Sequence, residues 1–363
     1  MTTQNLPTPC ILIDAGIARK NMASMAAYAK GHRLSLRPHT KTHKSTLLAV
    51  MQMELGAIGL TVAKVGEAQV MAAAADDLLI AYPIVDPARC AELAQLARGR
   101  SIRVGIDSHV AADAIGAAAQ SADVTIGILV DLDVGHHRTG VQTPADALEL
   151  AQHIARQPNL RLDGLMFFPG HLSSSLLGQE DALRTIDARL SEVIQLWKQN
   201  GLEARIISGG STPAALRSHV MKNLTEIRPG TYVFNDMNSV HAGCATLDEC
   251  AATIIATVVS NAVPGQIVLD AGSKTLTSDR CGPAPESGHG HIVEYPQAKI
   301  TKLSEEHAQV DVTACESVPK VGQRIAIIPN HICPCVNLQD SIWWAERGEP
   351  PRKIAIEARG KVY

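Results

Sequence analysis

The chain of 363 residues has few aromatic side chains, which make up 3% of its sequence. Its cores must therefore be built from Ala, Val, Ile and Leu. It also lacks any run of about 20 apolar residues, the length that a membrane-spanning helix needs. The segment 1–5 has no basic stretch followed by an apolar one, so we expect no secretory signal. These absences predict a cytoplasmic protein with no membrane partner.

Neither sign of charge dominates, because 33 Lys and Arg stand against 36 Asp and Glu. Without a long basic stripe, nucleic acid is not an expected partner. The 8 cysteines follow no regular framework spacing. In a chain of this length they are typical of reduced thiols rather than of a disulfide scaffold.

The first two thirds of the chain repeat one pattern: a short β-branched run, a turn and an Ala-rich helical stretch. This pattern is typical of βαβ units. Roughly eight strands are expected, the number that closes a parallel barrel. An open doubly wound sheet is the alternative, but no Gly-x-Gly-x-x-Gly segment opens a helix after the first strand. The expected strands are 33–37, 57–62, 78–83, 102–107, 125–131, 162–167, 204–208 and 226–234. Helices are expected between them at 44–55, 65–75, 88–97, 111–121, 144–156, 180–200 and 213–221.

The pattern changes after about Gly243, where strand-like runs alternate with Pro, Gly and charged turns. The expected strands here are 252–259, 266–269, 291–294, 308–312, 324–328 and 353–358. The sequence therefore predicts an α/β protein: a (β/α)8 TIM-like barrel at 15–243 and a C-terminal, mainly antiparallel β domain. That second domain would consist of 1–14 and 244–363, with 10–14 adding a strand to it.

A basic segment at 37–44 places Lys41 just after an expected strand. Alternation along a strand would direct Arg37, His39 and Lys41 to one face. A partly desolvated amine among cationic groups would have its pKa lowered toward neutrality, so that it could form a Schiff base with a carbonyl or with pyridoxal phosphate. A solvated basic loop is the alternative interpretation.

Chemistry in a parallel barrel takes place at the carboxyl ends of the strands. The Gly- and Ser-rich segment 208–213 follows the seventh expected strand and leads into a helix primed by Pro213. Backbone N–H groups and hydroxyls there would bind an anion such as a phosphate. An ordinary strand-to-helix loop is the alternative.

His331 and Cys333 form a second cluster, two residues apart near an expected strand end. On one strand face they could bind one cation and leave positions open for water and substrate, as in catalytic sites. The alternative is a buried cysteine beside a capped histidine. Cys335 is a further candidate, whereas His136, His137, His289 and His291 are more often surface or supporting histidines.

Taken together, the segments RPHTKTHK, DVGHHRTG, PGH, SGGSTP, RPGTY and PNHICP resemble the metal-activated pyridoxal-phosphate enzymes that include D-threonine aldolase, D-serine dehydratase and D-threo-3-hydroxyaspartate dehydratase. The resemblance spans nearly the whole chain. It implies the fold of alanine racemase, with the cofactor in the barrel. It also implies a homodimer whose active site forms between the barrel of one subunit and the β domain of the other.

The resemblance also implies roles for individual residues. Lys41 matches the Schiff-base lysine, Arg138 matches the arginine near the phenolic oxygen of the cofactor, and His171 lies where a polar group near the substrate is expected. His331 and Cys333 match the ligands of a divalent metal, zinc, manganese or cobalt, and a thiolate favours zinc. Phe168 departs from the tyrosine common before the PGH element. The cofactor's phosphate would be held by Gly209, Gly210, Ser211, Thr212, Gly230 and Thr231, and Ser208 and Tyr232 are further expected cofactor-binding residues.

The resemblance implies a lyase that acts on small D-configured β-hydroxy amino acids. Retro-aldol cleavage to glycine and an aldehyde is the first expectation. Elimination to a keto acid and ammonia, by a D-serine or D-threo-3-hydroxyaspartate dehydratase, is the alternative, and an amino-acid racemase is a further one. A non-enzymatic pyridoxal-phosphate carrier would not need the long C-terminal domain. A metal hydrolase would leave Lys41 and the phosphate segment unexplained.

Overall fold

The computed structural model describes residues 5–173 and 177–363, which form two compact units. The barrel unit comprises Met25–Lys41, Ser45–Gly230 and Lys361–Tyr363. The β unit comprises 5–24, Thr42–Lys44 and Thr231–Gly360. The domain boundaries that we expected from the sequence stay a prediction.

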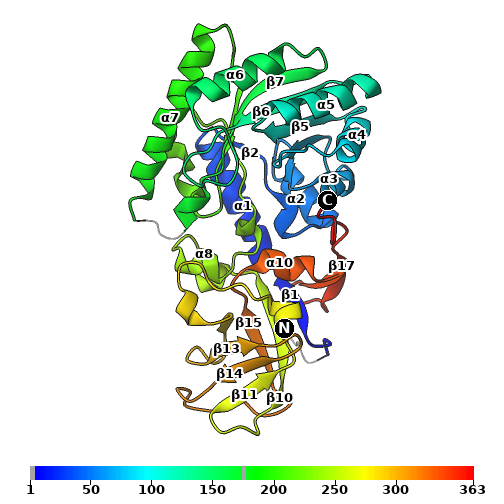
Figure 1. The fold of residues 1–363 in the computed structure, drawn as a ribbon. Coiled ribbons are helices and arrows are strands. Elements are labelled where there is room, and N and C mark those ends of the chain that lie inside the picture. The colour runs from blue at the N-terminus through cyan, green and yellow to red at the C-terminus, as the bar shows by residue number, and fades with distance from the viewer. Residues whose placement is uncertain (1–4, 174–176) are drawn as a thin grey trace. The chain divides into compact units, whose positions relative to one another are not determined.

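Eight parallel strands form the sheet of the barrel unit, in the order β2-β9-β8-β7-β6-β5-β4-β3 (Figure 1). A parallel bridge between His39 and Thr61 joins the two ends of this order. The expected α/β architecture is confirmed. The strands are β2 (Ser35–Leu36), β3 (Leu60–Val62), β4 (Asp77–Ile80), β5 (Ser101–Ile106), β6 (Ile126–Asp131), β7 (Leu160–Met166), β8 (Ile206–Gly209) and β9 (Glu226–Ile227).

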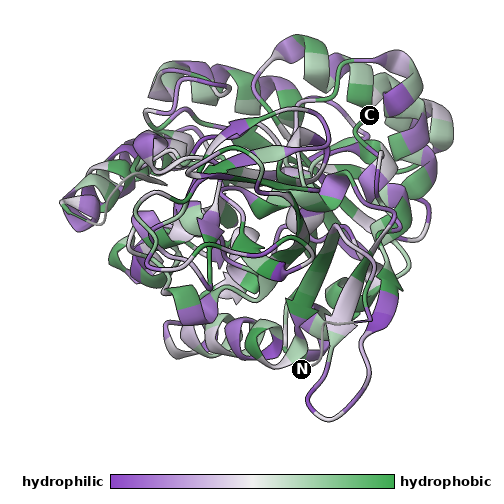
Figure 2. Cartoon of the chain, turned by 90° about the horizontal axis from the view of Figure 1, so that it is seen from below, coloured by the Kyte–Doolittle hydropathy of each residue, from purple (hydrophilic) through white to green (hydrophobic). Residues whose placement is uncertain are grey.

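Apolar strands and amphipathic helices build this unit. All six residues of β6 are buried, as expected for a parallel strand covered on both faces. In α6 (Pro144–Ala155), the buried residues Ala147, Leu150, Ala151 and Ile154 recur at helical spacing. Hydrophobic residues, green in Figure 2, concentrate on the strands. The other helices are α1 (Ala15–Gly31), which begins in the β unit, α2 (Thr46–Glu54), α3 (Val65–Met71), α4 (Pro87–Leu96), α5 (His109–Ala122) and α7 (Gln179–Gln199).

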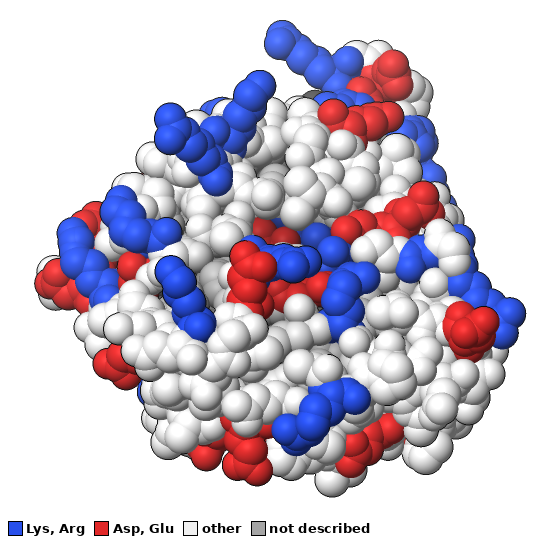
Figure 3. Space-filling view, turned by 90° about the horizontal axis from the view of Figure 1, so that it is seen from above, with Lys and Arg blue, Asp and Glu red and all other residues white. Residues whose placement is uncertain are grey.

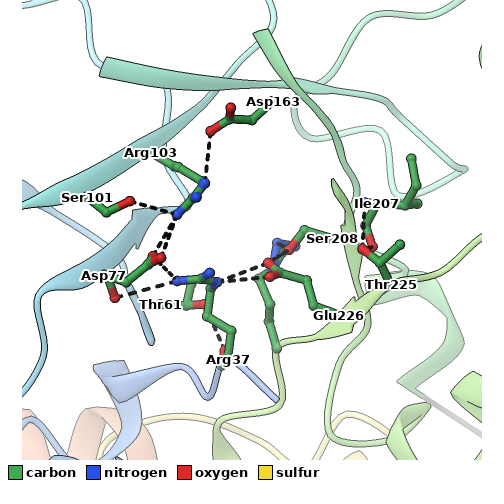
Figure 4. Close-up of polar contacts among 11 residues, drawn as sticks. Arg37, Thr61, Asp77, Ser101, Arg103, Asp163, Ile207, Ser208, Thr225 and Glu226 are labelled. Atoms are coloured by element: carbon green, nitrogen blue, oxygen red, sulfur yellow. Dashed lines mark hydrogen bonds and ion pairs between the residues drawn. The ribbon is translucent and has the colours of Figure 1, made fainter. Parts of the chain in front are cut away.

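Polar residues cross the inside of the barrel and form a chain of alternating charge (Figure 4). Arg37 contacts Glu226 and Asp77, Asp77 contacts Arg103, and Arg103 contacts Asp163. These residues come from β4, β5, β7 and β9 and from the segment after β2. The network therefore connects strands that are far apart in the sequence.

One expected helix has a different form. The segment predicted as a helix at 213–221 is a 3-10 helix, η3 (Ala215–Val220). Its N-terminus has no side-chain cap, and a turn at 212–214 precedes it. Short 3-10 helices of this kind are common connectors.

The β unit contains the second sheet, in the order β13-β14-β11-β10-β1-β16-β17, with β15 paired to β10 and β12. The expected strand at 10–14 is confirmed: β1 pairs antiparallel with β10 and parallel with β16. The strands are β1 (Cys10–Asp14), β10 (Ala252–Ser260), β11 (Gln266–Leu269), β12 (His291–Ile292), β13 (Lys299–Leu303), β14 (Ala308–Asp311), β15 (Arg324–Ile328), β16 (Ser341–Ala345) and β17 (Arg352–Ala355). Short α-helices of this unit are α8 (Met237–His241), α9 (Ser273–Leu276) and α10 (Ile332–Asn337).

The outer surface carries both signs of charge. On the face drawn in Figure 3, Lys and Arg side chains are interspersed with Asp and Glu. Among the described residues, no helix is both long and apolar enough to cross a membrane.

Candidate functional site

Lys41 lies in a single 3-10 turn, η1 (Thr40–Thr42), beyond the carboxyl end of β2. The chain stays paired as far as His39, whose backbone N–H donates to the Pro229 carbonyl, and turns only at Thr40. The predicted placement of Lys41 on one strand face with Arg37 and His39 is therefore wrong, because Lys41 lies in the turn. The Lys41 side chain is exposed, whereas the sequence predicted partial desolvation. The turn therefore presents an accessible primary amine at the catalytic end of a barrel strand.

The buried Glu67 on α3 stabilises this turn through a hydrogen bond to Thr40. Its carboxylate is fully buried; it accepts hydrogen bonds from the Thr40 hydroxyl at 2.7 Å and from the Ala63 backbone N–H at 3.0 Å. The residue before Lys41 is thus tied to the helix after the neighbouring strand. Glu67 was not foreseen, because a glutamate in the first turn of a helix is ordinarily a solvated partner of the helix dipole.

The loop from Ser208 to Thr212 connects β8 to η3 and fits an anion. Gly209 packs so closely on Phe167 that an added Cβ atom would lie 2.1 Å from its ring. Gly210 has a φ of +98°, a backbone conformation that residues other than glycine rarely adopt. The Ser211 hydroxyl is buried and has no hydrogen-bond partner among the described residues. Because an unsatisfied buried hydroxyl costs free energy, a phosphate in this loop would complete its hydrogen bonding.

Arg228 and Glu226 fix the first residue of this loop. The Ser208 hydroxyl donates to Glu226 Oε1 at 2.6 Å and accepts from Arg228 Nη1 at 3.3 Å. Arg228 Nη2 also donates to the Phe167 carbonyl at 2.7 Å. Burial lowers the pKa of Arg228 to about 10. The Ser208 hydroxyl is therefore engaged inside the barrel. The sequence placed Arg228 in a motif but assigned it no role.

A carboxylate shapes the loop after β6 that carries Arg138. Asp133 Oδ1 accepts the backbone N–H groups of Gly135, His136 and His137, each at 3.0 Å. Burial would raise the pKa of Asp133, but these donors and the His137 side chain hold it well below its usual range. The loop is thereby folded around one anionic side chain, which explains the Asp and Gly of the DVGHHRTG segment.

Asp131, the last residue of β6, ties down the other end of this loop. It is buried, and its Oδ2 accepts a hydrogen bond from the Thr139 hydroxyl at 2.8 Å. Burial raises the pKa of Asp131 to about 6, although Thr139 and the positive charges of Arg228 and Arg138 oppose this shift. Gly140 N–H donates to Asp107 at 2.9 Å. Arg138 is thus held between two anchored segments.

His171 lies in η2 (Gly170–Ser173), on the loop after β7. Its side chain is exposed, and its ring packs against Gly135, where an added Cβ atom would lie 3.3 Å from His171 Cε1. The structure therefore brings together the loops that carry Arg138 and His171. Both loops follow barrel strands at their carboxyl ends, where the sequence placed them.

The β unit brings His331 and Cys333 together, but on a helix start rather than on a strand. His331 is the N-cap residue of α10, and Cys333 lies in its first turn. The predicted placement at a strand end is wrong, because β15 ends at Ile328. The two side chains nevertheless lie close enough for each to shift the pKa of the other. Among the described residues, no group of three or more His, Cys, Asp or Glu side chains is arranged around a common metal position.

Nearby carboxylates, and each side chain acting on the other, shift the pKa values of His331 and Cys333. His331 Nδ1 lies 2.8 Å from Asp279 Oδ2. Burial would lower the pKa of His331, but Cys333, Asp236 and Asp279 raise it to about 9. Burial would raise the pKa of Cys333, but His331 lowers it below its usual value. A carboxylate that orients one imidazole nitrogen is the usual support of a metal-binding histidine, so the pair fits a divalent cation with two protein ligands.

Two threonines of the β unit lie beside Cys333. The Thr42 and Thr231 hydroxyls lie 3.2 and 3.6 Å from the Cys333 sulfur. Tyr232 is buried in η4 (Thr231–Val233), and Gly230 ends the barrel unit before it. Cys335 is fully buried with its thiol near the Leu276 carbonyl, away from a ligand role. Thr42 and Asp279 were not foreseen from the sequence, since nothing local marks them.

Two family models match the chain. The family described as "Alanine racemase, N-terminal domain" matches residues 13–238, and the one described as "Putative serine dehydratase domain" matches residues 251–344. The first match alone covers more than half of the chain. The two together follow the barrel and the C-terminal strands described above.

Proteins similar to this chain match it over nearly its full length. The D-threonine aldolase of Arthrobacter sp is 32% identical over 97% of this chain and 93% of its own length. The crystal structure of D-threonine aldolase from Filomicrobium marinum superposes with a TM-score of 0.91 at 28% identity, covering 98% of this chain and 97% of that one. A cysteine-to-alanine variant of D-threo-3-hydroxyaspartate dehydratase, solved in a metal-free form, gives a TM-score of 0.88 at 27% identity and covers 97% of both chains.

The barrel with its lysine turn and anion loop, the C-terminal sheet with its His-Cys pair and these full-length similarities agree with one another. The chain belongs to the alanine racemase-like family of pyridoxal-phosphate enzymes that includes D-threonine aldolase and D-threo-3-hydroxyaspartate dehydratase.

Proposed function

We propose that this protein is a lyase that uses pyridoxal phosphate and a divalent metal to cleave D-configured β-hydroxy amino acids, with glycine and an aldehyde as products. The observation that carries the proposal is the His331–Cys333 pair with Asp279 on His331 Nδ1. A racemase develops no charge on a β-oxygen, whereas a metal-activated lyase uses a Lewis acid there. The full-length similarity to D-threonine aldolases supports the retro-aldol reaction.

The residues of the barrel unit fit the cofactor. Pyridoxal phosphate, when bound, supplies an electron sink for negative charge at the carbon beside the amino group. Lys41 offers its amine for covalent attachment. Once displaced, this amine would donate a proton to that carbon after the retro-aldol cleavage, whereas in the elimination it would accept the α-proton. Ser211 and the backbone of Gly209 and Gly210 would hold the phosphate. Arg138 would bind an anionic oxygen of the cofactor.

The β unit fits the metal. A divalent cation, when bound, supplies Lewis acidity toward an oxygen of the substrate. His331 would bind it through Nε2, because Nδ1 faces Asp279, and Cys333 would bind it as the thiolate. Two protein ligands leave positions for water and substrate.

His171 is the proposed group for moving the proton of the β-hydroxyl. Its exposed imidazole lies on the β7 loop against Gly135, beside the loop of Arg138. Neutral imidazole can accept a proton near neutral pH. In the retro-aldol reaction the hydroxyl proton leaves as the bond between the α- and β-carbons breaks. In the elimination, the α-proton and hydroxide leave instead.

The dehydratase is a second candidate, favoured by the match of residues 251–344 to the putative serine dehydratase domain. Product analysis separates the two reactions. The protein, supplied with pyridoxal phosphate and zinc, manganese or cobalt in turn, would be incubated with D-threonine and D-serine. Glycine and an aldehyde are expected from D-threonine. Keto acid and ammonia as the main products would establish the dehydratase instead.

The same assay tests whether turnover depends on the metal and whether the protein is instead a racemase. Chelation should abolish turnover while the cofactor stays bound, and added metal should restore it. Conversion of D-threonine by the chelated protein at the wild-type rate would contradict the metal-dependent lyase, and L-amino acid products would indicate a racemase. The proposal includes a homodimer in the cytoplasm, which light scattering and cell fractionation test.

A further inference from the structure

Phe168, on the loop after β7, is half-buried between the guanidinium group of Arg138 and the imidazole ring of His136. The guanidinium carbon of Arg138 lies 4.8 Å from the centre of its ring, within the range of a cation–π contact. The His136 ring meets the same phenyl ring edge-on, with centres 5.2 Å apart and planes at 81°. Phe168 thus links two side chains of the β6 loop to the β7 loop.

The phenyl ring is the contact that holds the Arg138 side chain. Arg138 is exposed, and no hydrogen bond or ion pair from its guanidinium is found within 5–173 and 177–363. Its five N–H donors are therefore available to an anionic oxygen. A long side chain with free donors needs an apolar or aromatic surface to limit its rotamers, and Phe168 provides that surface.

The backbone on both sides of the Arg138–Phe168 contact is held by hydrogen bonds or by close packing. Asp133 collects three N–H groups in the loop of Arg138, as described above. On the other side, a Cβ atom at Gly170 would lie 2.4 Å from the Phe168 ring and 2.7 Å from His136 Cε1. Only glycine leaves room for the stack at this position. The ring is therefore closely packed rather than loosely placed on the surface.

We propose that Phe168 is a positioning residue: the face of its ring holds the Arg138 guanidinium in the orientation that binds an anionic oxygen of the cofactor. This inference rests on the proposed function. The residue at this position would then act through the face of its aromatic ring, because phenylalanine has no hydroxyl group. A residue that only filled space would act on stability and not on Arg138.

Matched substitutions separate these two roles. Phe168→Leu keeps an apolar side chain of similar bulk but removes the ring face, whereas Phe168→Tyr keeps the ring. Arg138→Gln removes the cation that the ring holds. We would titrate the apo forms of the wild type, the three single variants and the Phe168→Leu/Arg138→Gln double variant with pyridoxal phosphate by absorbance. Thermal unfolding of each variant would be recorded in parallel.

Phe168→Leu should weaken pyridoxal-phosphate binding about three- to thirty-fold, the factor for loss of a partly desolvated cation–π contact. Phe168→Tyr should retain the wild-type affinity to within about twofold, since the ring remains. In the Arg138→Gln background, Phe168→Leu should have no further effect, because the ring then has no cation to hold.

Two outcomes would overturn the inference while leaving the proposed function intact. One is a Phe168→Leu variant with wild-type affinity. The other is a Phe168→Leu loss that persists in full when Arg138 is already Gln, which indicates space filling. A wild-type chain that binds no pyridoxal phosphate would instead overturn the proposed function, and this inference with it.

Discussion

The Arg37 guanidinium is inserted between two carboxylates inside the barrel, with its Nε donating to both oxygens of Glu226 at 3.1 Å. Its Nη1 donates to Asp77 at 2.5 Å. The Arg37 side chain is only 2% exposed. Burial would lower its pKa, but the two carboxylates raise it. Arg37 therefore stays charged and joins the start of β4 to the start of β9 (Figure 4).

Removal of this cation should be strongly destabilising. Arg37→Met would remove the cation that pairs with the buried Glu226 carboxylate, and breaking a buried ion pair in this way costs about 3–5 kcal/mol. Urea unfolding followed by circular dichroism would measure the loss. Arg205→Met is the matched control, because the Arg205–Glu203 pair lies on the surface and contributes little. Equal midpoints for the two variants would contradict the structural role of Arg37.

The strand pattern of the barrel could be predicted from the sequence, but the charge network could not. Short apolar runs separated by Ala-rich helices indicate βαβ units wherever they occur. The pairing of Arg37 with Asp77, 40 residues away, depends on the closure of the sheet. Strands β2 and β9 are shorter than expected, since Pro38 and Pro229 follow them and offer no N–H donor. Strand β13 was missed because its charged residues Lys299 and Lys302 concealed the alternation.

The candidate site was partly predictable for the same reason. Lys41, Ser211, His331 and Cys333 lie in short segments whose composition suggests their chemistry, and their roles stay predictions. The supporting residues are distant from them in sequence: Asp279 precedes His331 by 52 residues, and Glu226 follows Ser208 by 18. Each has an ordinary local sequence, and only the tertiary fold brings it to its partner.

Covalent attachment of pyridoxal phosphate should occur at Lys41. The η1 turn presents this amine to solvent, whereas Lys44, three residues later, is buried near the Ala358 carbonyl. Borohydride reduction of the holoprotein followed by peptide mapping would locate the modified lysine. Modification should disappear in Lys41→Ala and persist in Lys64→Ala. Attachment at another lysine in the wild type would refute the assignment.

Ser211→Ala should weaken pyridoxal-phosphate binding by about ten- to a hundredfold. The reason is that the buried Ser211 hydroxyl has no partner in the described chain, and a hydrogen bond to a charged group contributes about 1.5–3 kcal/mol. Titration of the apoprotein would measure the change. Pyridoxal without its phosphate is the control ligand and should bind both forms equally. An equal loss for both ligands would show that Ser211 does not face the phosphate.

Asp279→Asn should weaken metal binding about ten- to a hundredfold without unfolding the β unit. The Asp279 carboxylate orients His331 through Nδ1, and loss of such supporting carboxylates typically has this effect. Competition with a chromophoric chelator would give the zinc affinity. Asp311→Asn is the control, because Asp311 only caps the Thr313 turn of the same unit. Unchanged zinc affinity in Asp279→Asn would mean that His331 is oriented by other groups.

The free energy of unfolding of the barrel should fall as the pH rises and the buried Asp131 carboxyl loses its proton. Burial raises its pKa from 3.8 to about 6, so the folded chain holds the proton more tightly than the unfolded chain does. Stability from this group is therefore fully present below about pH 4 and is lost as the pH rises to about 6, by up to about 3 kcal/mol.

Asp131→Asn removes this titration and keeps an oxygen for the Thr139 hydroxyl. Relative to the wild type, its free energy of unfolding should therefore improve between pH 4 and pH 7.5. Urea midpoints at both pH values would measure the difference. The exposed Asp123→Asn variant is the control and should show the same difference from the wild type at each pH. If Asp131→Asn behaves like Asp123→Asn, Asp131 is already ionised at pH 4 in the folded chain, and burial does not set its charge.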